Sequence, residues 1–381
     1  MSLYVPEGTP PIVPGAMARI ERRLPHPGEV LVREGARVEP QDIIARAFLP
    51  SPPQIVNVAQ SLAIPPALVE RAMVCEVGEQ VFQGRDLARA GFAGARSCKA
   101  PVSGIVTAID GETGYVTIAP DPLEMTMAAN VRGVVMEILP HEGVVIETPA
   151  AQVYGVFGVG EERNGVLQLL VTDPDQVVTH EYLDARYSYM ILIGGSGITA
   201  EALRRAVQSQ VRGIIVGGID EQELRDFLGW GSYLEWHTGI RSWRLPDPQH
   251  TPEPGLTLLV TEGFGVRPMS SPIFDLLSSR AGQEALIDGT TRIRHGMRRP
   301  RLVVSLARSD GMNLDLPRPR IRPEAMVRLL DPDHLGQVAR VLSVPSVPIT
   351  LSSGVRAAAV EVFQEPQPPF WVPRTAVEVL N

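Results

Sequence analysis

Few residues of this sequence stand in the patterns that catalytic or metal sites require. The seven histidines form neither an H-E-x-x-H motif nor another metal-ligand spacing, and no G-x-S-x-G sequence offers a serine nucleophile. The two cysteines, Cys75 and Cys98, lack C-x-x-C spacing. Lys99 is the only lysine among 35 basic residues, which excludes a P-loop and most lysine chemistry. We therefore expect no metal and no cofactor, and a protein that is not an enzyme.

Glycine-rich segments follow three apolar runs in the middle of the chain: 194–197, 217–218 and 263–265. In open α/β sheets, ligands bind outside the carboxyl ends of the strands, and backbone N–H groups at a helix start can hold an anion. A small-molecule or phosphate site is one reading of this pattern, and tight turns that require glycine are the other. The residues of the candidate site are Gly195, Ser196, Gly197, Thr199, Gly218, Thr261 and Glu262.

Arginines are concentrated near the C-terminus. Residues 292–328 hold ten arginines and three acidic residues, a net charge of +7, so the rest of the chain carries −15 because the total is −8. Arginine suits bidentate phosphate contacts, but these side chains could equally pair with acidic faces of neighbouring domains. The candidate nucleic-acid or partner contacts are Arg292, Arg294, Arg298, Arg299, Arg301, Arg318, Arg320 and Arg322.

The pattern of residues 151–310 alternates between short apolar runs and helical segments. Runs such as 189–195, 211–219 and 256–265 read as buried strands, and 199–209 reads as a helix with Thr199 as its N-cap. This alternation predicts a three-layer α/β domain with a mainly parallel sheet. A loop at 229–250 carries three tryptophans and two arginines; it either stacks on a partner or folds onto its own domain.

The first 150 residues contain two internal repeats. The segment 34–45 matches 77–88 at an offset of 43, and 103–120 matches 132–149 at an offset of 29, with Val116 matched to Val145. Each unit reads as two short strands joined by a glycine turn. Such hairpins need to pack together to bury their apolar faces.

The phrases GEVLVREGARVEPQDIIA, VGEQVFQGRDLA and APVSGIVTAI resemble those of biotinyl/lipoyl-like barrel-sandwich hybrid domains. The resemblance implies such a domain over residues 1–150, with a helical insert near 55–72. Lys99 directly precedes Ala100-Pro101 in the sequence and does not stand in the M-K-M sequence of a carrier lysine. The resemblance thus implies a structural or docking module rather than a swinging arm.

The C-terminal segment 322–381 resembles KOW-containing, SH3-like barrels of NusG-type proteins. The resemblance rests on Val327, Leu329, Gly336, Val338 and Val341, and on the closing phrase FWVPRTAVEVL. It implies a small barrel that contacts RNA, ribosomal protein or RNA polymerase, although such barrels also dock proteins.

Charge and hydropathy narrow the class of protein further. The net charge of −8 argues against a protein that coats DNA uniformly. No run approaches 18 apolar residues, so we expect no membrane span, and the two cysteines favour a reducing cytoplasm. We expect a non-enzymatic multidomain binding or scaffold protein that contacts RNA, DNA or the transcription–translation machinery. The alternatives are a protein–protein assembly component without nucleic acid, and a small-molecule- or nucleotide-binding subunit.

Overall fold

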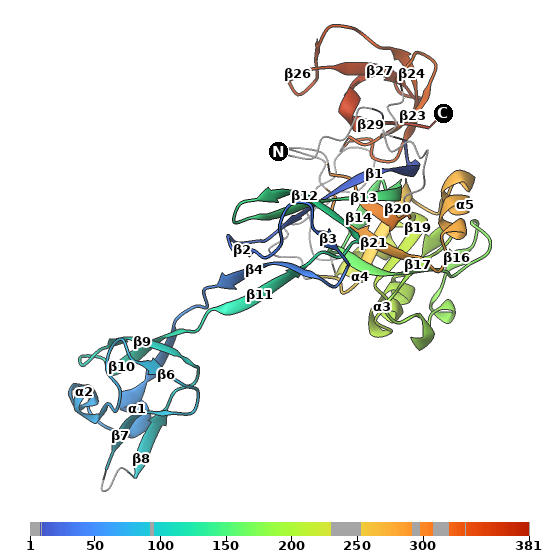
Figure 1. Ribbon diagram of the computed structural model, residues 1–381. Helices are drawn as coiled ribbons and strands as arrows, with labels where there is room; N and C mark the ends of the chain where they lie inside the picture. The colour runs from blue at the N-terminus through green and yellow to red at the C-terminus, as the bar shows by residue number, and fades with distance from the viewer. Residues whose placement is uncertain are drawn as a thin grey trace.

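A computed structural model of the 381-residue chain describes residues 8, 10–91, 95–229, 253–291, 298–307, 320–331 and 333–380. The fold is mostly β and divides into several sheets. Three bodies follow one another: a C-terminal unit, a central sheet with its helices, and a β unit that projects from the sheet (Figure 1). Arg292, Arg294, Arg318 and the tryptophan-rich loop lie outside the described residues.

An eleven-stranded sheet forms the centre of the molecule. Its order is β14-β20-β19-β17-β15-β21-β22-β13-β12-β3, and β1 pairs with β13. The bounds are β1 Ile12–Arg23, β3 Arg37–Val38, β12 Gly133–Leu139, β13 Gly143–Tyr154, β14 Phe157–Val159, β15 Arg163–Leu169, β17 Met190–Ile193, β19 Gly213–Ile219, β20 Thr257–Phe264, β21 Glu284–Asp288 and β22 Arg301–Ser305.

Parallel pairing is confined to four neighbouring strands of this sheet: β15, β17, β19 and β20. All other pairings are antiparallel. The expectation of a mainly parallel sheet is therefore wrong for the sheet as a whole. The physical reason is that β13 runs through residue 150, the expected domain boundary, and joins the N-terminal hairpins to β22 in one continuous sheet.

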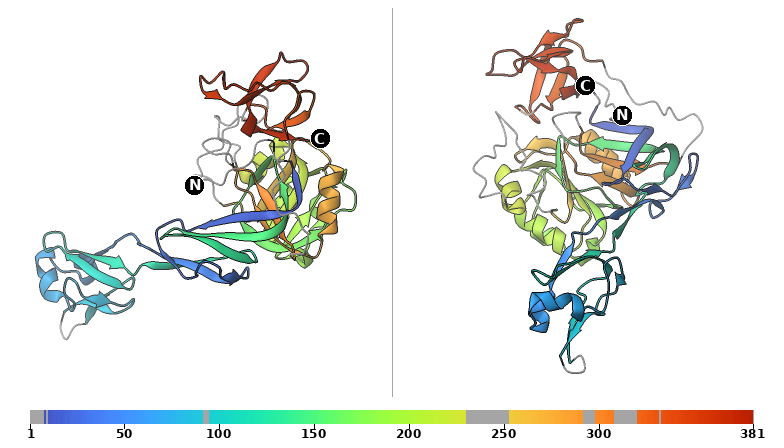
Figure 2. Two further views of the ribbon diagram at one scale, coloured as in Figure 1. Left: turned by 45° about the horizontal axis from the view of Figure 1, so that its top comes forward. Right: turned by 90° about the vertical axis from the view of Figure 1, so that its left-hand side faces the viewer.

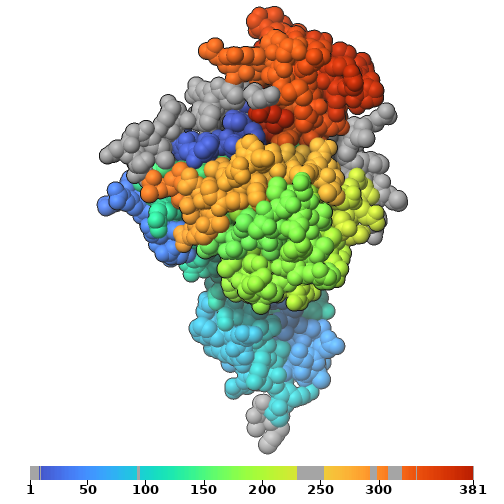
Figure 3. All heavy atoms as spheres, turned by 90° about the vertical axis from the view of Figure 1, so that its right-hand side faces the viewer, coloured from blue at the N-terminus to red at the C-terminus, as the bar shows by residue number. Residues whose placement is uncertain are grey.

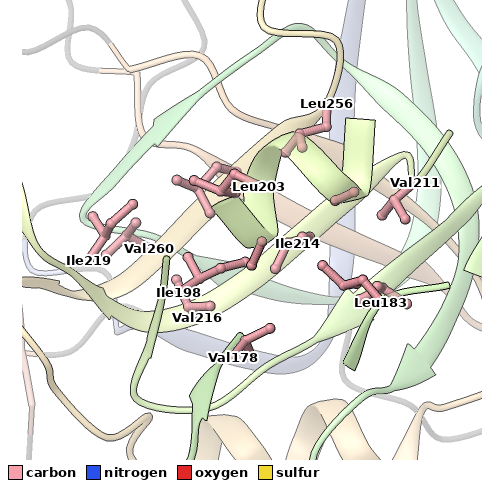
Figure 4. Packing of buried hydrophobic residues seen from close by; sticks show 14 of the residues in the cluster. Val178, Leu183, Ile198, Leu203, Val211, Ile214, Val216, Ile219, Leu256 and Val260 are labelled. Carbon is pink, nitrogen blue, oxygen red and sulfur yellow. The ribbon is translucent and has the colours of Figure 1, made fainter. Parts of the chain in front are cut away.

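The parallel strands carry a hydrophobic core on each face. Ile214 and Val216 of β19 face the core that includes helices α3 (Ala200–Gln208) and α4 (Glu221–Leu228). Ile215 faces a second core with α5 (Ser271–Ser279). This alternation explains why GIIVGGI is apolar throughout: both faces of the strand are covered. Figure 4 shows Leu203 of α3 and Ile214 and Val216 of β19 in the first core.

Local sequence sets the start and end of these helices. Thr199 is the N-cap of α3, as expected, and its Oγ1 accepts a hydrogen bond from Ala202 N at 3.2 Å. Asp220 caps α4 in the same way, and Gly229 ends that helix with a φ of 69°. Short segments complete this part of the chain: η3 His180–Tyr182, η4 Ala185–Tyr187, β16 Val177–Val178 and β18 Gly197–Ile198.

The N-terminal repeats form two similar units, one inserted into the other. The proximal unit comprises residues 12–49 and 123–149, and the distal unit comprises residues 54–120. Val38 pairs with Gly133 in the proximal unit, and the matching Val81 pairs with Gly104 in the distal unit. The remaining bounds are β2 Glu29–Val30, β4 Ile43–Leu49, β5 Gln54–Asn57, β6 Gln80–Val81, β7 Asp86–Ala90, β8 Arg96–Lys99, β9 Gly104–Ile109, β10 Tyr115–Pro120 and β11 Leu123–Ala128.

The two units share even their irregularities. Between β4 and β11 the register shifts after the pair Ala45–Met127, and between β7 and β8 it shifts after the pair Ala88–Cys98. These residues match at the offsets of 43 and 29. The strands β4 and β11 carry the distal unit away from the rest of the molecule (Figure 1). The chain thus contains one β unit nested within a copy of itself.

The sequence match of Val116 with Val145 is one residue out of register. Val106 pairs with Ile118 in the distal unit, and the matching Val135 pairs with Ile146 in the proximal unit. Residues of β10 therefore match residues of β13 at an offset of 28, and Val116 matches Val144. The hairpin turn of the proximal unit is one residue shorter. Burial of Val116 and Val144, both at 0% exposure, requires this register, because a one-residue slip would turn the apolar face outward.

The distal unit differs from the proximal unit chiefly by its helices. The segment expected to be helical from residue 55 forms β5 first, and the helices begin at Val58: α1 Val58–Leu62, η1 Pro66–Leu68 and α2 Val69–Ala72. Residues of β1 in the proximal unit match residues of β5 in the distal unit at an offset of 34. After the helices, the matching residues Val30 and Met73 differ by 43. The helical connection is therefore nine residues longer than the loop it replaces. Val58, Leu62 and Val69 belong to a core that the distal unit forms by itself.

The C-terminal unit is a five-stranded antiparallel sheet with the order β28-β27-β24-β23-β29. A short 3-10 helix, η6 (Arg374–Ala376), leads into the last strand. The unit has its own core, which includes Val327, Val341 and Val360. The strands are β23 Met326–Leu329, β24 Val338–Ser343, β25 Ile349–Thr350, β26 Arg356–Ala357, β27 Ala359–Phe363, β28 Phe370–Pro373 and β29 Val377–Val379.

The C-terminal unit sits on the central body, on the side away from the distal unit (Figures 2 and 3). Gly8, close to the N-terminus, bridges to Glu378 in the last strand, so the two ends of the described chain meet at this junction. Among the described residues, no helix has the length and apolar character to cross a membrane.

Candidate interdomain site

The seven residues of the predicted glycine-rich site lie near the carboxyl ends of the parallel strands, as expected. Other parts of the protein bond to or pack closely against most of them. Ser196 donates its backbone N–H to Gln176 O at 2.9 Å and its hydroxyl to Asp175 O at 2.6 Å. Residue 267 crosses the same region, where Arg267 N donates to Ser196 O at 2.9 Å.

Close backbone approach explains the glycines without a ligand. A Cβ at Gly195 would lie 2.1 Å from Gln176 O, and a Cβ at Gly218 would lie 2.1 Å from Gly265 O. Both distances are far below van der Waals contact, so no side chain fits. Gly197 differs, because its nearest neighbours would be 3.9 Å away. The glycines at 195 and 218 thus allow loops to close over the strand ends.

Thr199, Thr261 and Glu262 also have protein partners. Thr199 caps α3, and Thr261 Oγ1 donates to Val216 O at 3.3 Å. Glu262 Oε1 accepts a hydrogen bond from Ser270 N, at the start of α5, at 3.0 Å. The second oxygen of Glu262 faces the C-terminal unit.

At this point the two predicted sites meet. Arg328 of β23 pairs through Nη2 with Glu262, and through Nη1 with Glu378 of β29 at 2.8 Å. Glu378 also pairs with Arg299, which lies two residues before β22. A chain of alternating charges, Glu262–Arg328–Glu378–Arg299, therefore runs from the central sheet through the C-terminal unit and back. We call these four residues the ion-pair chain.

The ion-pair chain is buried. Exposure is 8% for Glu262, 5% for Arg328, 0% for Glu378 and 5% for Arg299. Buried charges are tolerated where their hydrogen-bonding capacity is satisfied. Here most of that capacity is satisfied, and Arg328 Nε is the donor of the ion-pair chain that is buried without a partner. Arg328 Nη1 also donates to Thr261 O at 3.2 Å, and Arg299 Nε donates to Gly155 O at 3.2 Å. These contacts hold the chain of charges in one geometry.

Close packing accompanies the ion pairs. Gly336, the turn glycine of the KOW-like phrase, lies against Gly263, where an added Cβ would be 3.2 Å from the Gly336 Cα. Arg267 Nη1 donates to Gly336 O at 3.3 Å. Leu335 packs on the core of the central sheet. The junction therefore combines an apolar contact, a backbone contact and paired charges.

The predicted arginine contacts are divided between buried and exposed positions. Arg299 is buried and paired with Glu378, so its side chain does not reach solvent, where nucleic acid would contact it. Arg298 pairs with Asp288 at 2.6 Å, and half-buried Arg301 donates to Arg19 O at 3.3 Å. Arg320 and Arg322 are exposed. Of the predicted contacts within the described residues, Arg298 is exposed as well, and it differs from these two in that its guanidinium pairs with Asp288.

Glu378 was missed by sequence reasoning. In the closing phrase AVEVL, Val377 and Val379 face the core of the C-terminal unit, so the alternation predicts that Glu378 points to solvent. The central sheet covers that outer face and buries the carboxylate. Only knowledge of the domain contact could have identified it.

Chemistry beyond this junction is sparse in the described part of the chain. No group of three or more histidine, cysteine, aspartate or glutamate side chains there could hold a metal ion. Cys75 and Cys98 are both buried and unpaired, and burial raises the pKa of the Cys75 thiol. In comparisons with known proteins, no protein-family model and no curated protein matches this chain.

Proposed function

We propose that this protein is a non-enzymatic multidomain scaffold that holds binding modules in fixed relative positions. The ion-pair chain is the observation that carries the proposal. Exposed linkers allow domains to move. Here the ion pairs Glu262–Arg328 and Glu378–Arg299 join the C-terminal unit to the central sheet and fix its orientation. The contact between Gly263 and Gly336 and the packing of Leu335 oppose separation. A scaffold needs its binding modules in a fixed arrangement.

The domain identities form part of the proposal. We infer that the nested β units are hybrid-type modules, that the strands and helices around β19 are a three-layer α/β domain, and that the C-terminal unit is an SH3-like barrel. The supporting observations are the repeated pairings of Val38 and Val81, the two cores on either face of β19, and the 3-10 helix before β29. Two free cysteines favour a cytoplasmic location.

The distal unit is the part of the scaffold best placed to meet a partner protein. It projects from the body (Figure 3), and it exposes Ile55, Val77 and Phe82 at 68%, 58% and 61%. Such side chains on a projecting module offer apolar surface to a partner protein. This supports the assembly-component form of the function.

Nucleic-acid contact is a second candidate, and exposed Arg320 and Arg322 favour it. They lie at the entry to the C-terminal unit, where phosphate could reach them. Binding of this kind weakens steeply with salt. Fluorescence anisotropy with single-stranded RNA at low and moderate salt tests it, with the double variant Arg320→Ala/Arg322→Ala as the comparison. Equal binding by both proteins removes this candidate.

Cross-linking in the native cell tests the scaffold function. The tagged full-length chain is cross-linked, purified with and without nuclease, and digested for mass spectrometry. We expect defined protein partners that survive nuclease, with cross-links on both the distal and C-terminal units. Recovery of the chain alone, or of partners that vanish with nuclease, contradicts a protein scaffold.

A further inference from the structure

An open cleft of about 720 Å³ lies where the proximal unit meets the central sheet. Its walls come from distant parts of the chain: 130–132 before β12, 164–166 in β15, and 283–286 at β21. Tyr189, directly before β17, also lines it, so the cleft lies at the amino ends of the parallel strands, opposite the glycine-rich ends. The volume falls within the range of small-molecule sites.

Unpaired positive charge lines this cleft. Arg280, which follows α5, has no ion pair or side-chain hydrogen bond within the part of the chain that the structure describes, and its Nε is buried without a partner. Arg132 also lines the cleft and is held by Glu39 at 2.8 Å. Glu284 is the carboxylate that lines the cleft. Arg280 is partly exposed at the cleft, so an anionic ligand there would accept hydrogen bonds from the accessible part of its guanidinium.

Tyr189 provides an aromatic surface at the cleft. Its side chain is 55% exposed, and the guanidinium of Arg212 lies 5.0 Å from the ring centroid. The backbone of Tyr189 has a φ of 64°, which is rare for a bulky residue and persists only where the surroundings impose it. A strained bulky residue of this kind is often found at a ligand site.

Amide side chains supply neutral polar groups. Gln41, Asn164 and Gln283 line the cleft. Each amide offers both donors and acceptors, which suits the polar edge of a base or the hydroxyls of a sugar. The lining thus combines an unpaired cation, an aromatic face and amides.

We propose that this cleft binds a phosphorylated small molecule that carries a polar ring, a nucleotide or a sugar phosphate. Arg280 donates hydrogen bonds to the phosphate, the amides bond the polar atoms of the ring, and Tyr189 packs against its face. This binding is independent of the scaffold function, because it involves neither the ion-pair chain nor the distal unit.

Isothermal titration calorimetry on the full chain tests the proposal with three probes: ADP, glucose 6-phosphate and inorganic phosphate. We expect one ring-bearing probe to bind at least about tenfold more tightly than inorganic phosphate. Arg280→Ala weakens that binding by about tenfold or more. Tyr189→Asn, which removes the ring but tolerates the left-handed backbone, weakens it by roughly fivefold or more. Arg356→Ala, on the exposed surface of the C-terminal unit, leaves it unchanged.

Three results would overturn the proposal. One is the absence of binding by all three probes. Another is equal affinity for inorganic phosphate and the ring-bearing probes, which would leave the ring without a role. The third is unchanged affinity in both Arg280→Ala and Tyr189→Asn while circular dichroism shows that both variants are folded.

Discussion

At the scale of single residues, Glu378 is a fully buried carboxylate that pairs with two buried guanidinium groups. Its carboxylate is fully buried and neutralises Arg299 on one side and Arg328 on the other. Two guanidinium groups would remain buried with too little negative charge if this group were lost. The stability of the junction therefore depends on this side chain more than on any exposed charge.

Glu378→Gln is expected to destabilise the protein by about 3–5 kcal/mol, the usual effect of removing one partner of a buried ion pair. Urea unfolding followed by circular dichroism measures the change. Glu324→Gln is the matched control, because Glu324 pairs with Arg340 at 3.2 Å with both side chains largely exposed; it should change stability by less than about 1 kcal/mol. Equal effects of the two substitutions would contradict the importance of the ion-pair chain.

His334 gives the C-terminal unit a pH-dependent contact. Its Nδ1 lies 2.7 Å from Asp331, its ring stacks on Phe370 at 4.3 Å between centroids, and the hydrogen bond with Asp331 raises the pKa of His334 above 6.5. Because the folded pKa is raised, the stabilisation is fully present below about pH 6.5 and is lost as pH rises through the folded value. The melting temperature of wild type should exceed that of His334→Gln more at pH 5.5 than at pH 8.5. A difference that grows with pH would show the sign to be wrong.

At the scale of elements, the closed strand ends decide what the central glycines do. Gly217 of β19 leaves no room for a methyl group, since a Cβ would lie 2.1 Å from Arg267 O, whereas Gly197 of β18 has 3.9 Å of clearance. The same residue type therefore serves close packing at one position and is permissive at the other. A ligand bound against both glycines would need open space at Gly217 as well as at Gly197.

Gly217→Ala should destabilise the protein by about 1–3 kcal/mol, as overpacking does. Gly197→Ala should be neutral or slightly stabilising, because alanine fits there and restricts the unfolded chain. Thermal unfolding of the two variants makes the comparison. If Gly217→Ala were tolerated as well as Gly197→Ala, the loop over the strand ends would not be packed as described.

Local elements were predictable where a residue pattern acts over short distances. Thr199 as an N-cap, the buried run of β19 and the hairpins of the repeats follow from capping and alternation. The mixed sheet was not predictable, because β13 joins β22 across 147 or more residues of sequence. Burial of Glu378 and Arg299 likewise depends on which units touch, and the cleft at Arg280 depends on walls from distant segments. Periodicity carries none of that information.

At the scale of the whole molecule, the nested units predict that the distal unit folds on its own. Its core is formed by its own residues, including Val58, Val81 and Val106. In the distal unit, a short connection joins β7 to β8. In the proximal unit, the whole distal unit stands between the matching strands β4 and β11. Insertion into one hairpin thus leaves the surrounding unit intact.

Replacing residues 50–122 by the short β7–β8 connection, residues 91–95, should give a folded, shortened protein. Residues 53–121 expressed alone should also fold. Both are expected to show cooperative thermal unfolding by circular dichroism. Collapse of the shortened protein into an unfolded or aggregated state would show that the two units depend on each other.

The fixed position of the C-terminal unit on the central sheet is the central claim, and pulsed electron paramagnetic resonance tests it most directly. Spin labels at Ser279→Cys, the last residue of α5, and at Ser352→Cys, in the C-terminal unit, lie on exposed positions, while Cys75 and Cys98 are buried. We predict one narrow distance distribution that broadens in the added presence of Glu378→Gln. A broad distribution already in the protein with an intact ion-pair chain would contradict the claim.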